Sequence, residues 1–393
     1  MITFHEAFDL VLGNAPYLAA ENCRLESAAG RVLRQDISAD RDFPPFDRVM
    51  MDGYALRLED LKSGRGFTIV ASAPAGAPAV PLPDTGGACI EVMTGAPLPH
   101  GADCIVPVEE TERHGDAVRI SSDYDAVPRR FVHPLGSDAK KGDSLVKNGT
   151  LLGSREIGVA ASCGAAWLEV SRLPKISVAA TGDELVAVDE APAPHQIRQS
   201  NAHAISAALT RAGYSVMSSG CIRDDDETTE SQFRTLLGES DWIILTGAVS
   251  KGARDFVPEL LDSLGCRKLF HGVAQRPGKP AGCWLGPAGQ MIMALPGNPV
   301  AAITGLHAFV LPALAVASGM ERPKTRLVTT EENVHGLPGM TWHLPVTLAA
   351  DGKVTPAPTG NSGDFIGLLR SDGFITIPPR GEFAAAYRYT PWI

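Results

Sequence analysis

Three closely spaced glycine-containing loops constrain the fold of this chain more than any other feature of its sequence. They occupy residues 246–255, 276–280 and 295–299. The first and third loops directly follow strand-like apolar runs, 242–245 and 291–295, and lead toward helical sequence. In a parallel α/β sheet, ligands bind at the carboxyl ends of the strands, because backbone N–H groups and helix N-termini converge there. We therefore expect these loops to form one anion-binding pocket at a sheet edge.

The pattern along the chain predicts several domains. Strand-like and helix-like segments alternate over 173–321, which predicts an α/β domain with a parallel sheet. Short β-like runs separated by Gly and Pro predict an inserted β-rich domain over 51–139 and a small β-barrel over 322–393. We expect 1–50 and 140–172 to pair as one discontinuous mixed α/β domain. The predicted fold class is α/β plus β, with a central parallel α/β sandwich.

The composition limits the kinds of partner. A net charge of −10 without a long basic run argues against nucleic acid or an anionic membrane as a partner. Seven cysteines without a C-x-x-C pair are typical of free thiols in a reducing compartment. The N-terminus lacks the features of a signal peptide, and no uninterrupted apolar run is long enough to span a membrane. We expect a cytoplasmic protein.

Two common nucleotide-binding motifs are absent. The chain has no G-x-G-x-x-G, and neither of its Gly-Lys pairs has the surroundings of a Walker A loop. The segment 248–252 differs from the nucleophile elbow G-x-S-x-G only by Ala248 in place of the first glycine. Serine hydrolysis through Ser250 remains an alternative, although a serine in a turn more often makes local hydrogen bonds.

The side chains of the three loops suit a negatively charged ligand. Gly247 and Gly252 permit positive φ, so successive N–H groups can form an anion-binding nest. Arg276 and Lys279 flank Pro277-Gly278 and supply charge-assisted hydrogen bonds. Asn298 suits a helix N-cap before a proline in the first turn. This motif is equally consistent with a well-capped buried helix that binds no ligand.

Acidic residues are expected at the same edge of the sheet. Glu184 follows the strand-like run 176–180, Asp224 follows 215–222, and Asp255 begins a helix. Taken singly, each carboxylate also fits a solvated turn or a cap. Because Mg²⁺ in proteins bridges carboxylates and substrate phosphates, the three together predict a magnesium–phosphate site.

Several ordered motifs resemble one known family, the molybdopterin molybdenumtransferases, which include MoeA and the gephyrin E-domain. The motifs are MDGYA at 51–55, MTGAP at 93–97, GSD at 136–138, TGDEL at 181–185, IRDD at 222–225 and the three loops. The resemblance implies an α/β domain of the molybdopterin-binding type. It also implies that adenylylated molybdopterin and molybdate react, with Mg²⁺, to give molybdenum cofactor and AMP.

The resemblance further implies a homodimer in which the active cleft also draws on the N-terminal part of the partner copy. It implies catalytic roles for Asp52, Glu184 and Asp255, and Glu184, Asp224 and Asp255 as metal ligands. The implied substrate-binding residues are Thr94, Asp138, Gly247, Ser250, Gly252, Arg276, Lys279 and Asn298. The upstream molybdopterin adenylyltransferase is a further expected partner. Asp-Gly and Thr-Gly pairs, such as those at Asp52 and Thr94, also stabilise turns in proteins generally.

Four features depart from the family pattern. Ala248 adds a methyl group where the family commonly has glycine, and Arg276 stands where it often has lysine. His133 occupies a position where arginine is expected, and 47–50 reads Asp-Arg-Val-Met in place of a small polar stretch. These departures leave open a divergent paralogue that binds molybdopterin without turnover or handles tungstate. A scaffold role is a third possibility, but the chain lacks the long linker and second module of such a protein.

Overall fold

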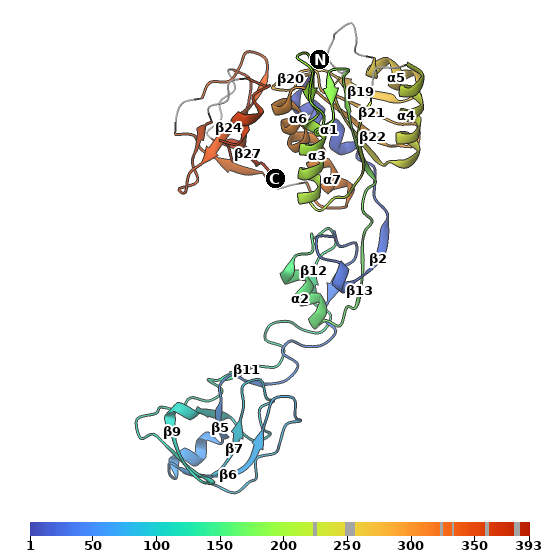
Figure 1. Cartoon of the computed structure of the whole chain (residues 1–393). Helices are drawn as coiled ribbons and strands as arrows, with labels where there is room; N and C mark the ends of the chain where they lie inside the picture. Colours follow the sequence, from blue (N-terminus) through green and yellow to red (C-terminus); the bar gives the residue numbers. More distant parts are fainter. Residues whose placement is uncertain (223–225, 248–255, 323–324, 332–333, 358–360, 381–385) are drawn as a thin grey trace. The chain divides into compact units, whose positions relative to one another are not determined.

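The computed structural model spans the whole chain, and its described residues form two compact units. The residues outside the description are 223–225, 248–255, 323–324, 332–333, 358–360 and 381–385. The first unit comprises 1–35, 148–154 and 167–393, and the second comprises 36–147 and 155–166. Figure 1 shows the elements of each unit. The boundaries of the four predicted domains stay a prediction.

A six-stranded sheet forms the centre of the first unit. Its strands, in spatial order, are β17 (Val216–Ile222), β14 (Ile176–Thr181), β18 (Trp242–Thr246), β22 (Met291–Leu295), β21 (Gly282–Leu285) and β19 (Arg267–His271). The first four are parallel, as predicted, but β21 and β19 are antiparallel to their neighbours. The sheet is therefore mixed. Only a short turn separates β21 from β22, so these two strands have to run in opposite directions.

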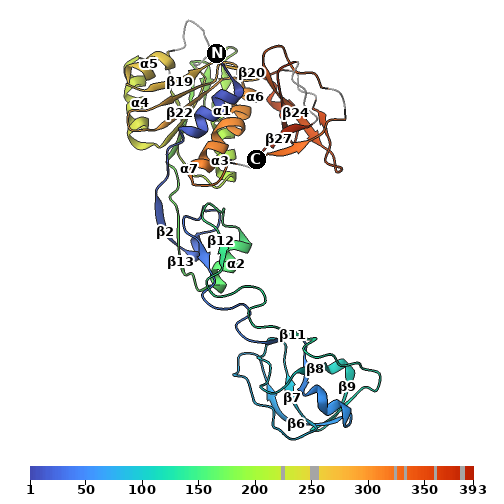
Figure 2. The same cartoon turned by 180° about the vertical axis from the view of Figure 1, so that it is seen from behind.

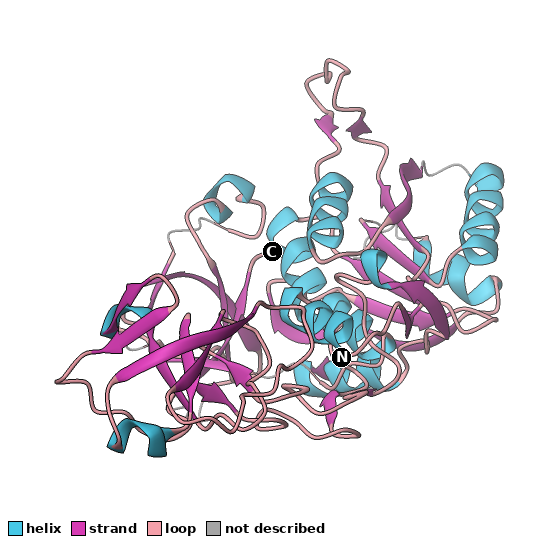
Figure 3. Cartoon of the chain, turned by 90° about the horizontal axis from the view of Figure 1, so that it is seen from below, coloured by secondary structure: helices cyan, strands magenta, loops and turns pink. Residues whose placement is uncertain are grey.

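Helices cover both faces of this sheet (Figures 1 and 2). One face packs against α1 (Phe4–Gly13), α3 (Asn201–Arg211), α6 (Pro299–Gly305) and α7 (Leu311–Ala317). The other face packs against α4 (Asp226–Glu239) and α5 (Val257–Ser263). Most helical turns of the described chain belong to this layered arrangement, as the colouring by secondary structure in Figure 3 shows. The predicted α/β class is confirmed.

One helical run of the described residues is long and apolar enough to cross a membrane. It joins α6, the π-helical turn Leu306–Val310 and α7 into 299–317, with a mean hydropathy of 2.0. This helix contains no uninterrupted apolar run of that length, because Thr304 and His307 interrupt its apolar sequence. This helix is 83% buried, as in the core helix of an α/β domain.

A second sheet of the first unit has seven strands and brings the C-terminal segment against the α/β part. Its strands are β1 (Ile2–Thr3), β20 (Val273–Arg276), β24 (Thr341–Leu348), β26 (Gly373–Ile377), β27 (Tyr387–Pro391), β23 (Arg326–Val328) and β25 (Val354–Pro356). An isolated bridge from Thr330 to Val354 connects β25 with the chain following β23. Closure of the predicted barrel would depend on this bridge.

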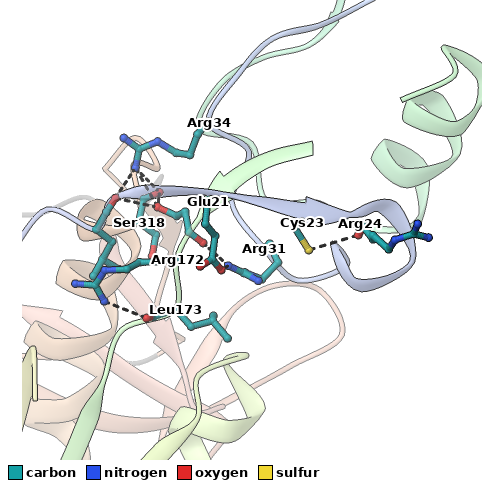
Figure 4. A network of polar contacts seen from close by, with 10 residues as sticks. Glu21, Cys23, Arg24, Arg31, Arg34, Arg172, Leu173 and Ser318 are labelled. Carbon is teal, nitrogen blue, oxygen red and sulfur yellow. Dashed lines mark hydrogen bonds and ion pairs between the residues drawn. The ribbon is translucent and has the colours of Figure 1, made fainter. Parts of the chain in front are cut away.

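The two-stranded ribbon of β2 (Ala20–Arg24) and β13 (Trp167–Ser171) is attached to the α/β part by polar contacts (Figure 4). Arg34 Nη1 donates to Ser171 Oγ at 3.0 Å, and Ser171 Oγ donates to the Ser318 carbonyl at 2.8 Å. Arg172 binds both carboxylate oxygens of Asp241, at 2.6 and 2.7 Å. The bidentate geometry holds the chain in place where it enters β14.

The second unit is built on a six-stranded sheet. Its order is β8 (Cys104–Pro107), β5 (Gly53–Leu56), β7 (Ala88–Val92), β6 (Gly66–Ala73), β10 (Ala117–Ile120) and β9 (Thr111–His114). Two separate apolar clusters form the core of this unit. Short pairs accompany the sheet: β4 (Arg48–Val49) with β11 (Val132–His133), and β3 (Ile37–Ser38) with β12 (Ser144–Val146). The β-rich character predicted for 51–139 agrees with these strands.

Candidate functional site

A pocket of about 500 Å³ lies beside the loop that follows β20. Arg276 and Lys279 line it, and both side chains are exposed. Neither cation forms an ion pair with any residue in the described part of the chain. No described carboxylate neutralises these two cations, and their role in binding an anionic ligand stays a prediction.

Two backbone hydrogen bonds fix the conformation of the loop at Gly278 and Lys279. The Gly278 carbonyl accepts from Ala281 N at 3.0 Å, and the Lys279 carbonyl accepts from Val273 N at 2.8 Å. Gly278 has a φ of +94°, and a Cβ there would lie 2.8 Å from Gln275 Nε2. Glycine is required at this position, because the turn needs a positive φ and Gln275 fills the adjacent space.

Asn298 lines the same pocket and occupies the N-cap position of α6. Its side chain makes no capping bond, so the prediction that it caps the helix is wrong at the level of the side chain. Instead Asn298 Nδ2 donates to Ser362 Oγ at 3.0 Å, and Val300 N donates to the Ser362 carbonyl at 3.1 Å. Ser362 comes from the C-terminal segment, and no local pattern in the sequence pointed to it.

Gly247 directly follows β18 and approaches a neighbouring strand closely. Its φ is +101°, and a Cβ there would lie 2.3 Å from the Thr181 carbonyl oxygen. Its N–H donates to the Leu295 carbonyl at 3.1 Å. The positive φ was predicted, but the close approach is to Thr181 and not to a ligand, and the N–H that the nest would use is bonded to Leu295. Ala248, Ser250, Gly252 and Asp255 lie outside the described residues, so the predicted nest beyond Gly247 stays a prediction.

Asn201, at the start of α3, connects two of the predicted loops. Its Nδ2 donates to Thr246 Oγ1 at 2.9 Å and to the Gly297 carbonyl at 2.7 Å. Its Oδ1, like Thr181 Oγ1, is buried and makes no hydrogen bond to a described residue. No motif in the sequence marked Asn201 as a site residue. A polar side chain at a helix start beside the strand ends was the signal that could have found it.

The predicted metal ligands are only partly described. Glu184 follows β14, is exposed, and its carboxylate oxygens lie 2.7 Å from the position a Gly182 Cβ would take. Asp224 and Asp255 lie outside the described residues. Within the described ranges, no three His, Cys, Asp or Glu side chains are grouped so that they could hold a metal ion. The magnesium site therefore stays a prediction, and Glu184 is the one predicted ligand among the described residues.

Asp52 and Thr94 meet in the second unit. Asp52 Oδ1 accepts from both Thr94 N and Thr94 Oγ1, each at 2.7 Å. The backbone hydrogen bond and then the hydroxyl bond lower the pKa of Asp52 below its ordinary value. Asp52 is thus a carboxylate at neutral pH, and the motifs MDGYA and MTGAP form one turn arrangement.

Asp138 lies in a second polar group of the same unit. His133 Nε2 donates to Asp138 Oδ1 at 2.7 Å, and Arg48 Nη2 donates to His133 Nδ1 at 2.9 Å. The bond from His133 is the main cause that lowers the pKa of Asp138. This group neighbours Thr94, because Val49 N–H donates to the Ala96 carbonyl and the Val49 carbonyl accepts from Gly95. The structure thus brings Asp52, Thr94 and Asp138 onto adjoining loops.

Comparison with known proteins places this geometry in a family. Family models match most of the chain: the MoeA N-terminal region (domain I and II) over 2–164, the probable molybdopterin binding domain over 177–316, and the MoeA C-terminal region (domain IV) over 328–386. A molybdopterin molybdenumtransferase of Synechocystis sp. is 34% identical, with 96% of each chain covered. One of Synechococcus elongatus is 31% identical, with 98% of each chain covered.

A solved structure of the molybdopterin biosynthesis MoeA protein from Pyrococcus horikoshii is similar over nearly the full length. The TM-score is 0.80 at 25% identity, and the match covers 99% of this chain and 98% of that one. The order of the three family models along the chain agrees with the order of the motifs found in the sequence. The chain therefore belongs to the MoeA family of molybdopterin molybdenumtransferases.

Proposed function

We propose that this protein transfers molybdenum from molybdate to adenylylated molybdopterin and releases AMP, which completes the molybdenum cofactor. One observation carries the proposal: Arg276 and Lys279, free of ion pairs with described residues, project from a backbone that hydrogen bonds hold in one conformation. Such preorganised cations stabilise oxyanions without first having to be ordered. Family membership supplies the reaction.

The described residues suit three binding tasks. Arg276 and Lys279 hold an oxyanion or phosphate by charge-assisted hydrogen bonds. Asn298 and Ser362 offer polar groups in the same pocket. Asn201 connects the end of β18 with the loop after β22, because its Nδ2 donates to both Thr246 and Gly297. Gly247 follows directly on this connected end of β18. These groups bind and orient the substrate.

Magnesium is part of the proposal. Mg²⁺ is usually bound by one or two protein carboxylates together with substrate phosphates. Glu184 fits this role, because its carboxylate is exposed at the carboxyl end of β14. Asp224 and Asp255 complete the proposed ligand set from outside the described residues. When bound, the ion would neutralise charge on the phosphate groups.

We further propose a cytoplasmic homodimer. Asp52, Thr94 and Asp138 of one copy would then complete the site of the other, which gives a function to the hydrogen-bonded carboxylates in the second unit. An upstream molybdopterin adenylyltransferase would supply the adenylylated substrate.

The decisive experiment measures AMP release by purified protein given adenylylated molybdopterin, Mg²⁺ and molybdate. Lys279→Ala should reduce this release, whereas Lys268→Ala, which removes an exposed lysine that does not line the pocket, should not. Absence of AMP release in parallel with an active insertase would overturn the proposal. Preference for tungstate in the same assay would favour the alternative metal, and ligand binding without release would favour a non-catalytic paralogue.

A further inference from the structure

A chain of hydrogen bonds connects the loop that carries Arg276 and Lys279 with two buried residues of the pocket lining, Gln275 and His343. Gln275 Nε2 lies 3.3 Å from the Gly278 carbonyl, and Gln275 Oε1 lies 3.3 Å from His343 Nε2. His343 Nδ1 in turn lies 3.2 Å from Thr376 Oγ1. The chain links β20, β24 and β26, whose residues are far apart in sequence.

Chemistry determines the direction of each bond. The Gly278 carbonyl can only accept, so the Gln275 amide nitrogen donates to it and Gln275 Oε1 is left as an acceptor. His343 must therefore carry its proton on Nε2. Burial, with smaller contributions from Arg388 and His5, lowers the pKa of His343 to about 3, so the ring is neutral. Its Nδ1 then accepts from the Thr376 hydroxyl.

The imidazole of His343 is fixed in place by aromatic packing. It is fully buried, and its ring centroid lies 4.7 Å from that of Phe4 and 5.3 Å from that of Phe374. Both contacts are edge-to-face, with interplanar angles of 73° and 84°. Gln275 is only 1% exposed. A buried network in which each member has a defined partner holds one geometry, because any alternative leaves a polar group unsatisfied.

We propose that His343 and Gln275 are positioning residues, which set the conformation of the loop so that Arg276 and Lys279 face the pocket. This inference rests on the proposed function, because it concerns the same anion pocket. Gly278 is the point of contact: its carbonyl accepts from both Gln275 and Ala281, and Lys279 follows it directly. The C-terminal sheet thereby controls a binding loop of the α/β part.

The test compares two buried histidines in the full-length protein. His343→Phe keeps an aromatic ring between Phe4 and Phe374 but removes both hydrogen bonds. His307→Phe is the matched control, since His307 is also buried, also makes two hydrogen bonds and also contacts an aromatic ring, but does not line the pocket. Both variants are expected to lower Tm.

The first measurement needs no ligand. Hydrogen exchange at the Ala281 amide reports whether the turn at Gly278 stays closed. Exchange should accelerate in His343→Phe and in Gln275→Met but not in His307→Phe. His343→Gln, which can still donate to Gln275, should restore protection. Equal exchange in His343→Phe, Gln275→Met and the control would overturn the inference. If His343→Phe does not fold, exchange at the Ala281 amide in Gln275→Met still tests the inference.

The second measurement is calorimetric titration with inorganic molybdate. His343→Phe should weaken binding about tenfold, the size of effect expected when a binding group is displaced by a fraction of an ångström. His307→Phe should bind like the wild type. If Lys279→Ala binds molybdate as tightly as the wild type, the pocket assignment fails, whatever the exchange data show. If only Lys279→Ala weakens binding, the positioning role fails and the pocket assignment stands.

Discussion

Arg48 and His133 face each other across the pairing of β4 and β11, with 2.9 Å between Arg48 Nη2 and His133 Nδ1. A guanidinium only donates, so Nδ1 accepts and the Nε2 proton of His133 is directed to Asp138. In the sequence, His133 and the segment 47–50, which contains Arg48, were two separate departures from the family pattern. In the structure they form one hydrogen-bonded chain, in which Arg48 stands behind the histidine that replaces the expected arginine.

The first prediction concerns the coupling of these two departures. Arg48→Ser leaves His133 Nδ1 without its donor, and His133→Arg brings a second guanidinium next to Arg48. Each single change should reduce AMP release. The double variant has neither the missing donor nor the adjacent guanidinium groups, so it should recover part of the release. We expect a coupling of about 1 kcal/mol in a double-mutant cycle of kcat/KM. Strictly additive losses would show that the two positions act independently.

The second prediction concerns pH. His133→Leu removes the bond that contributes most to the lowered pKa of Asp138, so this pKa should rise toward its ordinary value. A lowered pKa in the folded protein stabilises the fold above the unfolded pKa, and this contribution is lost as pH falls through the folded pKa. Because its folded and unfolded pKa values lie closer together, the variant should lack most of this contribution and should show a weaker dependence of stability on pH as the pH falls. Carboxyl-carbon NMR titration of Asp138 measures the shift, and Ser122→Ala is a control in the same unit that should leave it unchanged.

The third prediction concerns Gly247. Gly247→Ala places a methyl group 2.3 Å from the Thr181 carbonyl at a φ of +101°, so the free energy of unfolding should fall by about 2 kcal/mol or more. Gly220→Ala in β17 is the matched control, because a Cβ there meets no atom within 4 Å and φ is not positive. Urea unfolding measures both. A similar stability for the two variants would contradict the close approach at Gly247.

The fourth prediction concerns Asn201. Asn201→Ala leaves the Gly297 carbonyl and Thr246 Oγ1 without their donor, which should cost about 1–3 kcal/mol of stability. AMP release should also fall, because the loops after β18 and β22 lose their connection. Asn14→Ala also removes two side-chain hydrogen bonds, one to the Leu10 carbonyl and one from Arg267 Nη2, elsewhere in the same unit and should keep its activity. Full activity in Asn201→Ala would exclude a role for the connection.

Local patterns predicted the strands that lead into the candidate loops. The order of strand, glycine loop and helix identified β18 and β22 with the loops that follow them. The positive φ of Gly247 was predicted because it is a demand of the local backbone that few other residues meet, whereas that of Gly278 was seen only in the structure. Arg276 and Lys279 could be named because two cations around Pro277-Gly278 are visible in four consecutive residues; both line the pocket, and their binding role stays a prediction.

Tertiary structure decided which distant residues complete the site. Nothing near Gln275 in sequence indicates that it bonds to His343, which bonds in turn to Thr376, and nothing near Asn298 points to Ser362. The antiparallel direction of β19 likewise depends on its pairing with β21. The apolar pattern of a strand does not indicate which strand it will pair with. The positive φ of Gly247 could be predicted from the sequence itself, because backbone conformation depends on neighbours along the chain. The side-chain partners of the loops were set by packing, because a hydrogen bond forms between groups close in space, whatever their separation in sequence.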